Sequence, residues 1–129
     1  MLQRDYFLRL IEEFAIALTH FLEKKKEDKD DELKDMYRQY VGDYTLLRNL
    51  TVDELITYAF DNWKKSEVLD RLEIVAELLY AEASYKVNPL REILLKKSLM
   101  LFDWLDKNNT IYSITRKNKI ANIKKYISN

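Results

Sequence analysis

The sequence predicts an all-α protein that forms a single domain over residues 1–129. The chain has one glycine, Gly42, and one proline, Pro89, and because these residue types mark most turns and strand ends, few tight turns are expected. Apolar residues recur at i, i+3 and i+4 spacing, whereas no segment alternates apolar and polar residues over the length of a strand. These patterns predict about six helices.

The first helix is expected from about Leu2 to Lys24. Its polar residues share one arc when successive residues are placed 100° apart, whereas its apolar residues cover about 200°, much more than the stripe of a surface helix. The apolar set is Phe7, Leu10, Ile11, Phe14, Ala15, Leu18, Phe21 and Leu22. We therefore expect this helix to have more than one neighbour, either within the fold or in a homodimer.

Two shorter helices are expected next. The stretch 24–35 is highly charged and predicts a solvated loop followed by the first turn of a helix from Asp31 to Val41, with Gly42 as its C-terminal cap. A third helix is expected to begin at Thr51, because Thr51 and Glu54 have the spacing of a capping box.

The second half of the chain predicts three more helices. Ser66 is a suitable N-cap for a helix that continues to about Val87. Asn88 and Pro89 then form a start signal for a helix over 89–107, which we expect to form an antiparallel hairpin with the preceding helix. A turn at 108–110 leads to a last helix from about Ser113.

Composition narrows the class of protein. No apolar run approaches the roughly 18 residues that a membrane span needs, and charged residues near Met1 do not fit a signal peptide. The chain has no cysteine, which excludes disulfides, thiolate zinc sites and a cysteine nucleophile. We expect a cytoplasmic protein of bacterial type that does not associate with membranes.

Both ends of the chain resemble one protein family. The opening MLQRDYFLRLIEEF and the later stretch LLKKSLMLFDWLDKNNTIYSITRKNKIANIKKYI are similar to the first helix and the C-terminal half of a family of small bacterial all-helical proteins of unknown function. The resemblance implies tetratricopeptide-like helical hairpins, in which the small residues Ala76 and Ser98 would meet, although their separation is longer than in a standard repeat. It implies no site residues.

Catalytic and metal-binding patterns are not found in the sequence. His20 is the only histidine, and no Glu-x-x-His pair of the kind that binds di-iron centres occurs. Adjacent carboxylates such as Asp53 and Glu54 fall in first turns or on helix surfaces, and one glycine cannot form a phosphate-binding loop. We predict no catalytic residue, no cofactor and no metal, and therefore not an enzyme.

Two groups of apolar and aromatic residues are candidates for a partner-binding surface. The helix after Ser66 carries a second apolar stripe opposite its main one, formed by Ile74, Leu78, Ala81 and Tyr85. Either this helix is central and both stripes are buried, or the second stripe is the wall of an exposed groove that binds a peptide or a partner helix. Tyr37 and Tyr40 could line the same groove or cap the core.

Charge is distributed unevenly along the chain. Residues 1–90 hold 13 Lys and Arg against 19 Asp and Glu, a net charge of −6, whereas residues 91–129 hold 9 against 3, a net charge of +6. The last helix is expected either to bind nucleic acid or to dock on the acidic part of the protein. The residues concerned are Arg116, Lys117, Lys119, Lys124 and Lys125.

The sequence thus favours a non-catalytic protein–protein interaction module or small scaffold. Its partner would be a protein or peptide, and the wide apolar arc of the first helix predicts a homodimer through that helix. The alternative is a nucleic-acid-associated regulator that uses the basic C-terminal helix.

Overall fold

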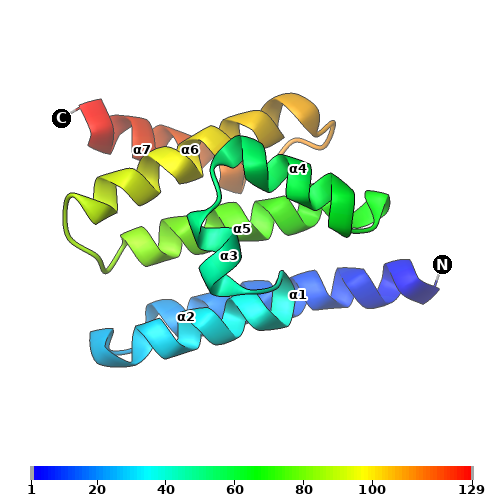
Figure 1. Cartoon of the computed structure of the whole chain (residues 1–129), viewed down its shortest axis with the longest axis horizontal. Helices are drawn as coiled ribbons and strands as arrows, with labels where there is room; N and C mark the ends of the chain where they lie inside the picture. Colours follow the sequence, from blue (N-terminus) through cyan, green and yellow to red (C-terminus); the bar gives the residue numbers. More distant parts are fainter. Residues whose placement is uncertain (1, 129) are drawn as a thin grey trace.

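The computed structural model describes residues 2–128, with side chains for 6–128. Within this part the chain is helical, with no β-strand, and has seven α-helices and a 3-10 turn at Lys65–Glu67 (Figure 1). The helices are α1 (Leu2–Leu22), α2 (Lys26–Tyr40), α3 (Tyr44–Asn49), α4 (Val52–Asn62), α5 (Val68–Ala83), α6 (Leu90–Asn108) and α7 (Ile114–Ser128). None of the helices in this part is both long enough and apolar enough to cross a membrane.

Helix α5 is the centre of the fold. In Figure 1, α1 and α2 lie on one side of it, α6 and α7 lie on the other, and α3 and α4 cross in front. Eleven of its 16 residues are buried, including Leu72, Val75 and Leu79 on its main apolar face. The apolar residues of α5 therefore form the middle of one continuous hydrophobic core.

The capping residues explain where α3 and α4 begin. The Thr51 side chain accepts from the Glu54 amide at 3.1 Å, and the Glu54 carboxylate accepts from the Thr51 amide at 2.9 Å, so the expected capping box is confirmed. The side chain of Asp43 caps α3 in the same way, by accepting from the Leu46 amide at 2.9 Å. Gly42 follows the C-cap of α2 with a φ of +144°, a conformation that favours glycine.

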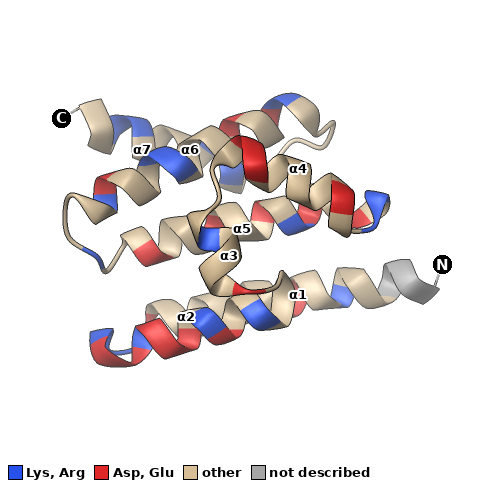
Figure 2. Cartoon of the chain, in the orientation of Figure 1, with Lys and Arg blue, Asp and Glu red and all other residues tan. Residues whose placement is uncertain are grey.

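Several expected boundaries are wrong. Helix α2 begins at Lys26, five residues before Asp31, so most of the charged segment is helical. In Figure 2 the blue and red stretches of α2, at the lower left, mark its Lys, Arg, Asp and Glu residues. Helix α3 was not expected, which raises the count from about six helices to seven. Helix α5 ends at Ala83 rather than Val87, and its N-cap is Glu67 rather than Ser66.

Helices α5 and α6 form the expected antiparallel hairpin and pack closely together. The Ser98 hydroxyl donates a hydrogen bond to the Ala76 carbonyl oxygen at 3.0 Å, and both residues are fully buried. Small residues at this position let the two helix backbones approach each other, so the expected contact between Ala76 and Ser98 is confirmed.

Candidate functional site

The second apolar stripe of α5 is not an exposed groove wall. Ile74 is 3% exposed, Leu78 is 0% exposed and Tyr85, just beyond the helix, is 8% exposed. Because α5 has neighbours on both sides, its second stripe packs against the chain's own helices as well. The interpretation of these three residues as the wall of an open groove is therefore wrong.

Tyr37 and Tyr40 are also buried, at 0% and 2% exposure, so they do not line an open surface. Their rings pack edge-on against Tyr44 and Phe14 respectively. Within the described part of the chain the Tyr37 hydroxyl is buried without a hydrogen-bond partner. Both residues belong to the core, and the expectation that they contact a partner is wrong on the same ground.

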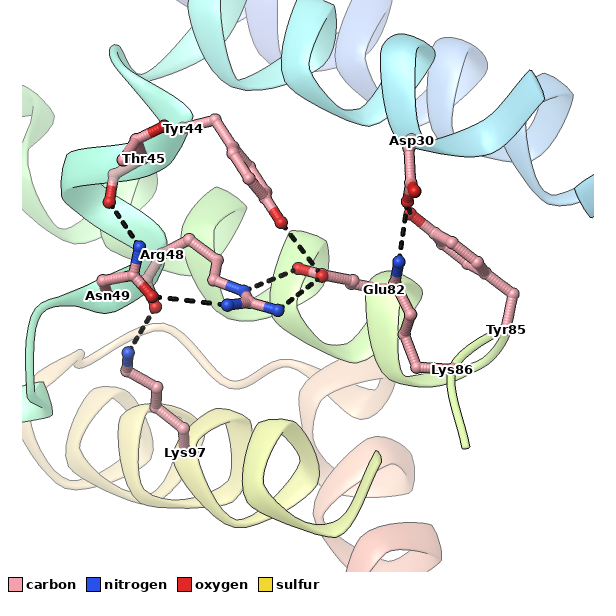
Figure 3. A network of polar contacts seen from close by, with 9 residues as sticks. All are labelled: Asp30, Tyr44, Thr45, Arg48, Asn49, Glu82, Tyr85, Lys86 and Lys97. Carbon is pink, nitrogen blue, oxygen red and sulfur yellow. Dashed lines mark hydrogen bonds and ion pairs between the residues drawn. The ribbon is translucent and has the colours of Figure 1, made fainter. Parts of the chain in front are cut away.

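A buried carboxylate, Glu82, is the centre of a polar network that joins α3, α5 and α6 (Figure 3). It accepts from the Tyr44 hydroxyl at 3.0 Å and from Arg48 Nε and Nη2 at 3.2 and 2.9 Å. The Arg48 carbonyl oxygen in turn accepts from Lys97 of α6. Since Glu82 is fully buried and its charge is paired with a guanidinium, we assign this network to the stability of the fold.

The basic residues of α7 bind mainly to the chain itself. Arg116 is 2% exposed, and its guanidinium pairs with Glu73 at 2.6 Å and with Asp106 at 3.1 Å. Lys119 pairs with Glu77. Glu73 and Glu77 belong to the acidic N-terminal part of the sequence, so the expected docking of the tail on that part is what the structure shows.

A continuous cationic track on α7 is therefore not formed. Arg116 is buried and Lys117 is paired with Asp106 at 2.5 Å, while Lys124 and Lys125 are exposed. The interpretation of Arg116 as part of an open basic patch is wrong, because Arg116 is buried and its charge is paired with two carboxylates.

His20 is exposed on α1. Over residues 6–128 no group of three or more His, Asp and Glu side chains is arranged to hold a metal ion.

The structure instead places a cleft between α1, α5 and the start of α7. It has a volume of about 370 Å³. Its apolar lining comes from three elements: Ile11, Phe14, Ala15 and Leu18 of α1, Ile74 of α5 and Ile111 of the α6–α7 loop. Its charged lining is Asp70, Glu73, Glu77, Arg116 and Lys119. We call this site the α1–α5–α7 cleft.

The wide apolar arc of α1 divides into two parallel stripes. The inner stripe, Phe7, Leu10, Phe14, Ala17 and Phe21, packs into the core, and its three phenylalanines are buried. The outer stripe is Leu8, Ile11, Ala15, Leu18 and Leu22, which recur at alternating steps of three and four residues. Leu8 and Leu22 are 42% and 49% exposed, Ala15 is exposed, and Ile11 and Leu18 are half-buried.

The charged residues that line the cleft are held in place by ion pairs between α5 and α7. Burial raises the pKa of the Glu73 carboxyl, and the neighbouring Arg116 guanidinium opposes this increase by attraction. Because the carboxylates of Glu73 and Glu77 are paired with cations of α7, they also fix the position of the cleft wall that α7 provides. The cleft therefore combines an apolar lining with an ionic one, as protein-binding surfaces do.

Sequence reasoning found the excess apolar area of α1 but missed the division into two stripes. The signal was present, since both sets follow the spacing of a helix–helix contact and are offset by one residue. Comparisons with known proteins add nothing to this surface: no protein-family model matches the chain, and neither curated proteins nor solved structures gave a significant match.

Proposed function

We propose that this chain is a non-catalytic protein–protein interaction module or small scaffold, and that its binding surface is the outer stripe of α1 with the α1–α5–α7 cleft. The observation that carries the proposal is that α1 presents five apolar residues at helix-contact spacing, of which Leu8, Ala15 and Leu22 are exposed and Ile11 and Leu18 are half-buried. Leu8 and Leu22 mark the two ends of this stripe and are each more than 40% exposed.

The spacing of the outer stripe favours a helical partner. Residues separated by alternating steps of three and four lie along one line on a helix and pack against a second helix that runs beside it. The cleft beside the stripe has both apolar and charged lining residues, which suit the two faces of an amphipathic helix. A partner helix would bury its apolar face there and place polar residues at Glu73 and Lys119.

The architecture supports a further part of the proposal. We infer that the α5–α6 hairpin is a tetratricopeptide-like unit and that the chain is a member of the bacterial family that its two ends resemble. Support comes from the close contact between Ala76 and Ser98, since small residues meet in this way between the two helices of such a unit.

The alternative proposal is a nucleic-acid-associated regulator. It is now supported only by Lys124 and Lys125, which are exposed, and by Lys117, whose side chain is 46% exposed but already paired. Phosphate binding by these lysines would weaken as salt concentration rises. A salt titration of binding to random-sequence DNA tests it, and no binding at low ionic strength would contradict it.

Site-specific photocrosslinking tests the interaction module. A photoreactive phenylalanine derivative is placed at Leu8 or Leu22 of the full chain, in the cells that produce it, and at Ile93 of α6 as a control. Ile93 is 58% exposed and belongs to α6, a helix on the other side of α5 from α1. We expect protein adducts from the two positions on the stripe and none from Ile93; no adduct from either stripe position would contradict the proposal.

A further inference from the structure

The outer stripe of α1 is nearly symmetric about Ala15. Its order is large, large, small, large, large, with Ala15 in the middle and Leu8 and Leu22 seven residues away on either side. When a second copy of the helix is placed antiparallel with the two Ala15 residues opposite each other, Leu8 faces Leu22, while Ile11 and Leu18 are neighbours that are one residue out of register. Such a stripe is self-complementary about a two-fold axis, which is the requirement for an isologous homodimer.

The small central residue allows close contact. Ala15 is exposed and has no side chain beyond Cβ, so two helix axes that cross at this residue can approach to the lower end of the usual range of about 8–10 Å. The contact would run from Leu8 to Leu22, a length of about 21 Å at 1.5 Å per residue.

We propose that the occupant of this surface is α1 of a second copy of the chain, bound antiparallel across a two-fold axis at Ala15. This inference rests on the proposed function and names its partner. Each copy inserts the outer stripe of its α1 beside the α1–α5–α7 cleft of the other, so that the exposed Ile111 of the cleft lining gains an apolar neighbour. A single contact thereby covers both the stripe and the cleft.

Sedimentation equilibrium of the full chain over a range of concentrations tests the dimer. We expect wild type to be dimeric and Ala15→Glu to raise the dimer Kd about a hundredfold or more, because two like charges would then meet at the axis without water. Ile16→Glu is the matched control: Ile16 is 61% exposed, is adjacent in sequence and points away from the stripe, so its Kd should change less than about threefold. Circular dichroism checks that both variants keep wild-type helicity.

The dimer and the interaction module can fail separately. A wild-type chain that stays monomeric while Leu8 and Leu22 crosslink to a different protein overturns the second copy as the occupant and leaves the interaction module in place. A monomer that gives no adduct from either position overturns both.

Discussion

The guanidinium of Arg48 in α3 donates to both carboxylate oxygens of Glu82 in α5, at 2.9 and 3.2 Å. This pair fixes the short helix α3 against the central helix, where few apolar contacts would hold six residues. The Glu82 side chain is fully buried, while that of Arg48 is 20% exposed. The pair therefore depends on both partners, because a buried carboxylate without its guanidinium is costly.

Removing the Glu82 carboxylate should destabilise the fold strongly. Glu82→Ala leaves the Tyr44 hydroxyl without its acceptor and the Arg48 guanidinium without its carboxylate, with only Asn49 Oδ1 among the described residues still accepting from it. We expect the free energy of unfolding to fall by about 3 kcal/mol. Urea unfolding measures the change. Asp35→Ala is the control, because Asp35 pairs with Arg38 on the surface and its loss should cost less than about 0.5 kcal/mol. A loss below about 1 kcal/mol for Glu82→Ala would contradict the role assigned to this network.

Removing the Tyr37 hydroxyl should stabilise the protein. This hydroxyl is fully buried without a hydrogen-bond partner in the described part of the chain, so Tyr37→Phe removes a desolvated polar group and keeps the ring that packs on Tyr44. We expect a gain of about 1 kcal/mol in the free energy of unfolding, measured by urea denaturation. A variant that is less stable than wild type would contradict this prediction and would mean that the Tyr37 hydroxyl makes a favourable contact in the folded protein.

Alkaline conditions should unfold the protein in part through Tyr44. Burial raises the pKa of Tyr44 to about 12, and the adjacent Glu82 carboxylate adds to the effect. Between the unfolded value near 10 and the folded value near 12, the folded state holds a proton that the unfolded state has released, so stability falls as pH rises.

The Tyr44→Phe variant isolates this effect. The change removes one group that loses its proton on unfolding, so stability should fall less steeply with pH than in wild type. Urea unfolding at about pH 9, 10.5 and 12 gives the two slopes, which can be compared whatever the stability of the variant at neutral pH. Equal slopes for wild type and Tyr44→Phe would contradict the shifted pKa of Tyr44.

The sequence alone predicted the features that depend on residues close together in the chain. The helical class follows from spacing and from the scarcity of glycine and proline, and the cap at Thr51 follows from one hydroxyl and one carboxylate at the right separation. The α5–α6 contact at Ala76 and Ser98 was expected from the family resemblance rather than from local rules, and the hydrogen bond between the two residues confirms it.

The features that the sequence did not predict depend on contacts between residues far apart in the chain. An isolated α5 has two apolar stripes, and only the complete fold shows that Ile74 and Leu78 are covered by its neighbours. Helix α3 was missed because its six residues are held by the Asp43 cap and by Arg48, which pairs with a residue 34 positions away. In the sequence Arg116 belonged to a candidate basic surface, but in the folded protein its guanidinium lies between two carboxylates.

Disulfide formation by Ala15→Cys tests the central claim most directly. The chain has no cysteine, so each substituted thiol has only its symmetry mate to pair with, and disulfides form only when the two Cα atoms are within about 7 Å. At the proposed two-fold axis the two Cys residues meet, and we predict a covalent dimer under mild oxidation. Ile16→Cys, one residue away on the exposed side, should stay reduced. No dimer from Ala15→Cys at concentrations where wild type associates, or equal crosslinking from Ile16→Cys, would contradict the proposed contact.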